Sequence, residues 1–300
     1  MRFSSGDPIV DRRYLYAQGA AADGDWRVAA EMLEQALEIA PRWAPAWLAL
    51  GQAREELALV EGAVEAYRAA LALDPEDALG AEPRLARLGA ALPAGLRQSY
   101  VRALFDDYAP RYGEHLRLGL AYRGPELILE ALDSVAPGRR YGLAADLGCG
   151  DGLIGAALRS CVEALIGVDL SAEMLDLARK LDVYDALERQ EICAFLERGR
   201  ARTADLVVAA DCLPYFGDLT ALFAAIGRAL RKRGLFAFTA EFVDGVGYAI
   251  GRSLRFAHSG AYLRECAAEA GLTPRLLKPA AARREKGLPA PGWVGVFERT

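Results

Sequence analysis

The order of apolar and polar positions predicts two differently built parts of the chain. From residue 141 onward, short apolar runs alternate with amphipathic segments. The runs at 143–147, 164–168 and 204–211 are typical of buried parallel strands. The segments at 153–160 and 172–180 predict helices between them. This alternation indicates an α/β fold.

The later segments continue this alternation. Residues 222–232 predict a helix with cations towards its end, followed by Gly234. Cations in a last turn complement the helix dipole and glycine ends a helix, so this basic cluster needs no nucleic acid to explain it. Strands at 235–239 and 293–297, with a helix over 260–270 between them, complete this part. The cations are Arg228, Arg231, Lys232 and Arg233.

The first ninety residues contain an internal repeat. Ala29, Leu33, Ala36 and Pro41 recur as Ala63, Tyr67, Ala70 and Pro75, each pair 34 residues apart. This period and pattern resemble the tetratricopeptide repeat, a helix-turn-helix unit. A further helix over residues 78–90 is expected to cap the stack.

These repeats predict an all-α domain over residues 1–92. It is either a groove for a peptide or partner protein, or an appendage that packs on the rest of the chain or forms a homodimer. Two repeats make only a shallow groove, which favours the appendage. The stretch L-P-A-G at 92–95 marks the boundary. The second domain spans 93–300, with a helical lid or linker over 93–140 and the core over 141–300.

A glycine-rich turn follows the first apolar run. Asp146 lies near the end of this run, and Gly148, Gly150 and Gly152 follow at alternate positions. Glycines let the backbone pass close beneath a ligand, because no Cβ intervenes. The second run ends in Asp169, which can accept hydrogen bonds from both hydroxyls of a ribose. The dinucleotide fingerprint G-x-G-x-x-G has its third glycine one residue later, so the spacing disfavours a nicotinamide dehydrogenase.

The pattern D-x-G-x-G-x-G with a downstream acid resembles the class I S-adenosylmethionine-dependent methyltransferases. With the repeats, the layout is similar to a group of bacterial predicted methyltransferases that carry N-terminal tetratricopeptide repeats. The resemblance covers nearly the whole chain. It implies a Rossmann-like, seven-stranded sheet with an antiparallel last strand, and S-adenosylmethionine as the cofactor.

The resemblance also implies a set of cofactor-binding residues. Glu191 would take the adenine amino group and Ile192 would pack on the ring, although a solvated glutamate is the alternative. Tyr108 and Tyr112 are candidate lid residues near the methionine end, or aromatic anchors of a packed helix. The full set is Asp146, Gly148, Cys149, Gly150, Gly152, Asp169, Leu170, Glu191, Ile192, Asp211, Tyr108 and Tyr112.

The acceptor pocket is expected near the loop that follows residues 204–211, because open α/β sheets bind ligands at the carboxyl ends of their strands. The segment 242–265 is not typical of a core and is the best candidate for the rest of the pocket. Arg252 and Arg255 would suit an anionic acceptor. The predicted acceptor-binding residues are Tyr215, Glu241, Tyr248, Arg252, Arg255 and Tyr262.

Methyl transfer is an in-line displacement that needs at most a general base. His258 is the first candidate for this base, because the unperturbed pKa of histidine lies near neutrality. His115 is the second candidate. Both histidines are also compatible with a purely structural role.

Charge and composition narrow the class of partner. The net charge of −5 disfavours nucleic acid, because phosphate binding needs a basic surface. The sequence shows no signal-peptide core and no apolar run of bilayer length, so a cytoplasmic location and no membrane partner are expected. The five cysteines form no C-x-x-C pair and only two histidines accompany them, so no metal site is expected.

Three functions stay open at this point. The first is methyl transfer to a small molecule with an oxygen or nitrogen nucleophile. The second is a protein or peptide methyltransferase whose repeats recruit the substrate. The third is a module that binds the cofactor without catalysis, although Asp146, the glycines and Asp169 show no lesion that would indicate it.

Overall fold

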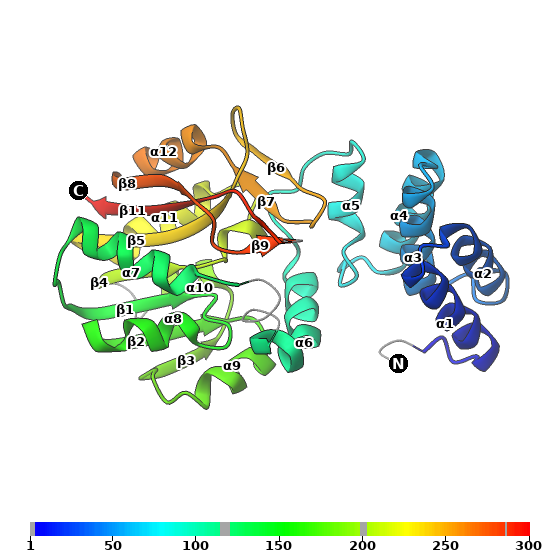
Figure 1. The fold of residues 1–300 in the computed structure, drawn as a ribbon, viewed down its shortest axis with the longest axis horizontal. Helices are drawn as coiled ribbons and strands as arrows, with labels where there is room; N and C mark the ends of the chain where they lie inside the picture. The colour runs from blue at the N-terminus through cyan, green and yellow to red at the C-terminus, as the bar shows by residue number, and fades with distance from the viewer. Residues whose placement is uncertain (1–3, 115–120, 199–202, 286) are drawn as a thin grey trace. The chain divides into compact units, whose positions relative to one another are not determined.

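The computed structural model describes residues 4–114, 121–198, 203–285 and 287–300 (Figure 1). The chain divides into two compact units, Met1–Pro93 and Ala94–Thr300. Within the described ranges, none of the helices has both the length and the apolar character needed to cross a bilayer.

The first unit, over its described residues, consists of helices. They are α1 (Pro8–Ala22), α2 (Trp26–Ile39), α3 (Ala44–Glu56), α4 (Val60–Leu73) and α5 (Ala81–Arg87). The helix α4 begins and ends 34 residues after α2. Leu33 on α2 and Tyr67 on α4 are both buried at equivalent positions. A Cβ at Gly51 on α3 would lie 2.5 Å from the ring of Tyr67, so the small residue lets α3 and α4 approach closely.

The second unit is built on a mixed sheet of nine strands, counted over the described residues. The strand order is β3-β2-β1-β4-β5-β11-β8, and β7 pairs with β5 and β6. The main strands are β1 (Tyr141–Leu147), β2 (Val162–Asp169), β3 (Ala186–Arg189), β4 (Ala204–Ala209), β5 (Leu230–Phe242), β8 (Leu272–Ala280) and β11 (Gly292–Arg299). The short ones are β6 (Tyr248–Ile250) and β7 (Phe256–His258), and a separate ribbon contains β9 (Arg284–Glu285) and β10 (Leu288–Pro289).

The strands β1 to β5 are parallel to their neighbours along this order, whereas β11 is antiparallel to both β5 and β8. The antiparallel last strand expected from the sequence is therefore confirmed. It lies between β5 and β8 and not at the edge of the sheet. The expected number of seven strands is wrong, because β6 and β7 join the seven strands of the main order beside β5. The result is a Rossmann-like α/β sheet whose parallel strands present their carboxyl ends along one edge.

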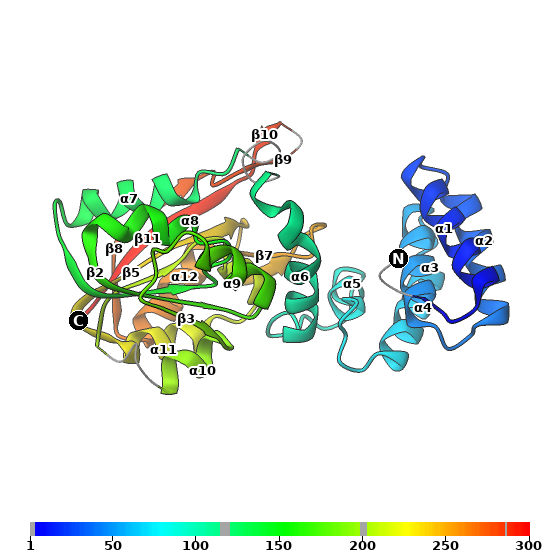
Figure 2. The same ribbon diagram turned by 90° about the horizontal axis from the view of Figure 1, so that it is seen from below.

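Helices cover both faces of the sheet (Figure 2). The helices α7 (Gly124–Val135) and α8 (Leu153–Leu158) share one buried core with β1. On the other face, α10 (Ile192–Arg198), α11 (Thr220–Ala229) and α12 (Gly260–Glu269) share a second core. All six residues of β4 are buried, as expected for a central strand. The helices α6 (Gln98–Glu114) and α9 (Ala172–Arg179) contact each other beside the carboxyl-end edge.

Two further sequence predictions are wrong in detail. The helix α11 ends at Ala229, because Leu230 is extended and pairs with Ala204 as the first residue of β5. Residues 231–233 therefore lie on a strand, and the helix dipole accounts for Arg228 alone. The segment 242–265 was expected to lie outside the core, but Phe256 on β7 is fully buried.

Candidate active site

The glycine turn after β1 depends on backbone conformations that favour glycine. Gly148, Gly150 and Gly152 have φ angles of 66°, 54° and 92°. The N–H groups of Gly148 and Cys149 donate to the carbonyl of Val168 at 2.8 and 3.0 Å, which joins the turn to β2. A side chain on any of the three glycines would strain the turn.

Asp169 closes β2 directly beside this turn. Its Oδ2 accepts a 3.0 Å hydrogen bond from the N–H of Gly150, and its Oδ1 accepts one of 2.9 Å from the N–H of Ser171. Burial raises the pKa of Asp169, although these backbone donors act in the opposite direction. Ser171 is also the N-cap of α9, where its hydroxyl accepts a hydrogen bond from the N–H of Met174.

Asp146 lies behind the turn and not on a cavity wall. Its carboxyl group is buried and accepts a 2.7 Å hydrogen bond from the hydroxyl of Tyr184. Burial raises the pKa of Asp146 to about 7. Two cavities lie at the carboxyl-end edge of the sheet. Like Asp146, Cys149 and Gly152 do not line either of them. These three residues shape the turn from behind.

A cavity of about 420 Å³ runs along the carboxyl ends of β1, β2 and β4. Eight predicted cofactor-binding residues lie on its wall: Tyr112, Gly148, Gly150, Asp169, Leu170, Glu191, Ile192 and Asp211. The carboxylate of Glu191 also accepts hydrogen bonds of 2.9 and 2.8 Å from the N–H groups of Cys193 and Ala194. Glu191 thus caps α10 while facing the cavity.

The helix α6 forms the opposite wall. Asp106 accepts a 2.6 Å hydrogen bond from the hydroxyl of Ser171, which fixes α6 to the start of α9. The ring of Phe105 makes edge-to-face contacts with Tyr112 and Tyr215, at centroid distances of 6.2 and 5.3 Å. Tyr108 meets Tyr112 in the same way at 5.2 Å. Both predicted lid residues therefore belong to an aromatic layer on α6.

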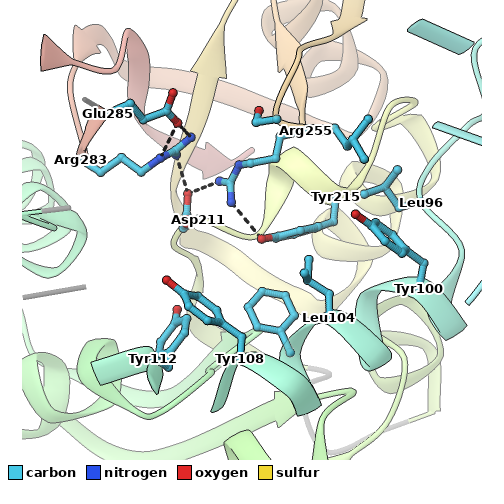
Figure 3. A pocket seen from close by; sticks show the side chains of 13 residues that line it. Leu96, Tyr100, Leu104, Tyr108, Tyr112, Asp211, Tyr215, Arg255, Arg283 and Glu285 are labelled. Carbon is cyan, nitrogen blue, oxygen red and sulfur yellow. Dashed lines mark hydrogen bonds and ion pairs between the residues drawn. The ribbon is translucent and has the colours of Figure 1, made fainter. Parts of the chain in front are cut away.

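A second cavity of about 220 Å³ adjoins the first (Figure 3). The two share five wall residues: Leu96, Phe105, Tyr112, Asp211 and Tyr215. The smaller cavity is otherwise lined by Tyr100, Leu104, Tyr108, Ser253, Leu254, Arg255, Arg283 and Glu285. The shared residues mark the junction where a ligand in one cavity would meet a ligand in the other.

An ion-pair network forms one side of the smaller cavity. Asp211, with a φ of 56°, accepts hydrogen bonds from both Arg255 and Arg283. Glu241 on β5 accepts from the same two arginines. Arg255 also donates to the hydroxyl of Tyr215 at 2.9 Å, and burial raises the pKa of this tyrosine. Figure 3 shows Asp211 between the two guanidinium groups.

His258, the predicted base, does not line either cavity. Its Nε2 lies 2.9 Å from the carbonyl oxygen of Phe216 and 3.2 Å from that of Gly217, so Nε2 carries the proton and donates to them. Its Nδ1 is buried and has no partner among the described residues. Burial lowers the pKa of His258 to about 4. The His258 ring thus supports the loop that follows β4 by binding its backbone carbonyls. The prediction that this ring lies in the site is therefore wrong.

Other predicted acceptor residues also lie away from the cavities. Tyr248 and Tyr262 pack around the ring of His258, and Tyr262 donates to Asp218 at 3.0 Å. Arg252 is exposed and does not line either cavity. His115 lies outside the described residues. Of the predicted acceptor set, Tyr215 and Arg255 line the smaller cavity, and Glu241 supports it through the arginines.

Several wall residues were missed by sequence reasoning. Residues 94–97, just before α6, and Gln98, its first residue, line the larger cavity, although the sequence indicated no more than a helical lid or linker there. Arg283 comes from the segment that precedes β9, 72 positions after Asp211. Some wall residues carried a signal. Phe105 lies close in sequence to Tyr108 and Tyr112, Cys212 and Phe216 belong to the loop expected near the acceptor, and Ser253 and Leu254 belong to the segment 242–265. Over the described residues, no group of three or more His, Cys, Asp or Glu side chains is arranged to hold a metal ion.

Comparisons with known proteins agree with this geometry. Residues 145–238 match the sequence profile of a family described as a methyltransferase domain. No curated protein matches the chain significantly. The fold is similar to 1,6-didemethyltoxoflavin-N1-methyltransferase of Burkholderia thailandensis, solved with 1,6-didemethyltoxoflavin and S-adenosylhomocysteine. The two are 19% identical over 70% of this chain and 93% of that one, with a TM-score of 0.52.

Magnesium protoporphyrin IX methyltransferase of Synechocystis, solved with bound SAH, is also similar in fold. It is 14% identical, the match covers 68% of this chain and 99% of that one, and the TM-score is 0.51. At these identities the likeness concerns the fold. The profile match spans β1 to β5, the part of the sheet that carries the glycine turn, Asp169 and Asp211.

Proposed function

We propose that this S-adenosylmethionine-dependent methyltransferase transfers the methyl group to an oxygen or nitrogen atom of a small molecule bound in the smaller cavity. The observation that carries the proposal is the junction of the two cavities at the wall they share, formed by Leu96, Phe105, Tyr112, Asp211 and Tyr215. Donor and acceptor must meet for an in-line displacement, and the cavities meet at that shared wall.

The larger cavity fits the cofactor in its chemistry. The carboxylate of Asp169, at the end of β2, suits ribose hydroxyls. The apolar side chains of Leu170 and Ile192 suit the adenine ring, and Glu191 lies beside them on the same wall. When bound, S-adenosylmethionine supplies an electrophilic methyl group on a sulfonium sulfur.

The protein's own part in the reaction is to position the reactants and exclude water. The aromatic layer of Phe105, Tyr108 and Tyr112 on α6 covers the junction from one side, and the network of Asp211 fixes the other. Asp211 lines both cavities, so its carboxylate can accept a hydrogen bond from the acceptor's O–H or N–H group and orient its lone pair. Because His258 does not line either cavity, we propose that it is not the general base.

Calorimetric titration with S-adenosylmethionine and S-adenosylhomocysteine tests the cofactor site, with NAD as the control ligand. An Asp169→Asn variant should bind both at least about tenfold more weakly, since one good hydrogen bond to a charged group contributes about 1.5–3 kcal/mol. Asp176→Asn, an exposed acid on α9, is the matched control and should bind normally. Binding of NAD in preference to S-adenosylmethionine would overturn the proposal.

A protein or peptide substrate is the second candidate, favoured by the helices repeated at 34 residues in the first unit. We propose that these helix pairs are tetratricopeptide repeats. Incubation of a cell extract with radiolabelled S-adenosylmethionine separates the candidates. Label in the small-molecule fraction supports the first function. Label in a protein, lost when residues 1–92 are deleted from a chain that still binds S-adenosylhomocysteine, supports the second.

A further inference from the structure

Every guanidinium nitrogen of the two arginines beside the smaller cavity already donates a hydrogen bond. All three nitrogens of Arg255 have partners: Glu241, Asp211 and the Tyr215 hydroxyl. All three nitrogens of Arg283 do as well: Asp211 at 3.3 Å, Glu241 at 2.6 Å, and Glu285 at 2.7 and 3.1 Å. A carboxylate or phosphate is best held by two parallel N–H groups of one guanidinium. Neither guanidinium group has two adjacent nitrogens that both lack a partner.

The charges of this network leave an excess of negative charge. Three carboxylates, those of Asp211, Glu241 and Glu285, face two guanidinium groups. The side chains of Arg283 and Arg255 are only 8% and 14% exposed, and those of Asp211 and Glu241 are 19% and 18% exposed, so water screens these four groups weakly. Glu285 is 51% exposed, so its charge is screened more strongly. An anion brought into the cavity would face Asp211 without an unpaired cation to compensate it.

Apart from Ser253, the rest of the wall consists of aromatic and apolar residues. Tyr100, Phe105, Tyr108, Tyr112 and Tyr215 all line this cavity of about 220 Å³. In Figure 3 the tyrosines on α6 and Tyr215 surround the space beneath Asp211. Flat rings pack well in such edge-to-face surroundings, and cations are attracted to ring faces.

From this juxtaposition of a saturated, net-negative ion-pair network with an aromatic wall, we infer that the smaller cavity binds a planar aromatic acceptor that is uncharged or cationic, and that it rejects anionic ones. The inference rests on the proposed function, whose acceptor site it specifies. It replaces the expectation of an anionic acceptor, which rested on Arg252 and Arg255. The first of these is exposed, and the second is paired with Asp211 and Glu241.

Three probes that share one phenol ring test the inference: tyramine is cationic, 4-methylphenol is uncharged and 4-hydroxybenzoate is anionic. Binding to the full chain is measured by ligand-observed NMR with S-adenosylhomocysteine at saturation. We expect tyramine and 4-methylphenol to bind at least about tenfold more tightly than 4-hydroxybenzoate, which corresponds to about 1.4 kcal/mol. Equal or tighter binding of 4-hydroxybenzoate, or binding of none of the three, overturns the inference.

A Glu241→Gln variant sharpens the test. It removes one negative charge and frees arginine N–H groups, so the preference should shift towards 4-hydroxybenzoate by about tenfold. Glu265→Gln, an exposed acid on α12, should leave the preference unchanged. If Glu241→Gln does not fold, Glu285→Gln takes its place, because that side chain is 51% exposed. An unshifted preference in the folded variant also counts against the inference.

Binding of S-adenosylhomocysteine separates this inference from the proposed function. If the chain does not bind S-adenosylhomocysteine, the proposed function is wrong, irrespective of which phenols bind. If it does bind and 4-hydroxybenzoate is the preferred probe, only the acceptor class is wrong.

Discussion

The hydroxyl of Tyr184 donates a 2.7 Å hydrogen bond to the buried carboxyl group of Asp146, and two glycines make room for the ring that carries it. A Cβ at Gly155 would lie 2.3 Å from this ring, and one at Gly167 would lie 2.9 Å from it. The tyrosine thus fills a slot between α8 and β2, directly behind the glycine turn.

Replacement of Gly155 by alanine should destabilise the protein, because the added methyl group would clash with the Tyr184 ring in this slot. Overpacking in a core costs about 1–3 kcal/mol, more than the gain of up to about 1 kcal/mol that alanine brings to a helix. Chemical denaturation measures the change in the free energy of unfolding. The control is Gly19→Ala on α1, where a new Cβ meets no atom within 4 Å, and it should be neutral or stabilising. A stable Gly155→Ala variant would show that Tyr184 can leave the slot freely.

The buried carboxyl group of Asp146 should make the free energy of unfolding depend on pH. Its pKa of about 7 in the folded state lies above the unfolded value near 3.9, so the folded state binds the extra proton. The stabilisation that the protonated Asp146 gives to the folded state is therefore fully present below about pH 4, and it is lost as the pH rises from about 4 to 7. The expected loss is up to about 4 kcal/mol. Denaturation of wild type and Asp146→Asn across this range measures it, and a constant difference between the two would contradict it.

The sequence predicted the parts of the site that depend on local backbone chemistry. Gly148 and Gly150 need positive φ, and Asp169 ends a strand whose neighbours are parallel, so the pattern alone placed them at one edge. Leu170, Ile192 and Asp211 were expected from the resemblance to class I methyltransferases, and they lie on the same cavity wall. The sequence therefore predicted the side of the larger cavity that the strand ends form, but not the side formed by residues 94–98.

The smaller cavity could not be predicted in this way, because its walls come from segments that only the tertiary structure brings together. Arg283 and Arg255 are paired through Asp211, and no spacing along the chain indicates that contact. His258 was misplaced for a related reason. Its polarity suggested an active-site group, but the ring is buried, where it satisfies backbone carbonyls of the loop at 216–217. The end of α11 was missed because Leu230 suits both a helix and a strand.

His258 should give a pH dependence of the opposite sign to that of Asp146. Its pKa is lowered to about 4 in the folded state. Histidine in the unfolded chain therefore binds a proton below about pH 6.5, whereas the folded ring stays neutral until the pH approaches 4. Its contribution is present above about pH 6.5 and is lost as the pH falls to about 4, by up to about 3 kcal/mol. A His258→Gln variant, which keeps a donor for the carbonyls, should lack this loss. The two groups oppose each other over the same range, so differences between wild type and each variant must be measured separately.

The hydrogen bond between Asp106 and Ser171 should control how firmly α6 closes the larger cavity. It is the 2.6 Å link between α6 and the start of α9, and it joins the helix that carries Phe105 and Tyr112 to the turn beside Asp169. A hydrogen bond to a charged group contributes about 1.5–3 kcal/mol. Asp106→Ala should therefore weaken binding of S-adenosylhomocysteine by about tenfold in calorimetry, and the amides of α6 should exchange hydrogen faster.

Asp107→Ala is the control for this change, because it removes the same charge from the next position of the same helix, where the side chain is 50% exposed. It should bind S-adenosylhomocysteine as wild type does. Ser171→Ala loses the N-cap of α9 as well as the link, so it should also cost about 1 kcal/mol of stability beyond that of Asp106→Ala. If Asp106→Ala keeps full affinity while the exchange of α6 quickens, the closure of this helix does not contribute to cofactor binding, and the wall formed by β1, β2 and β4 holds the cofactor by itself.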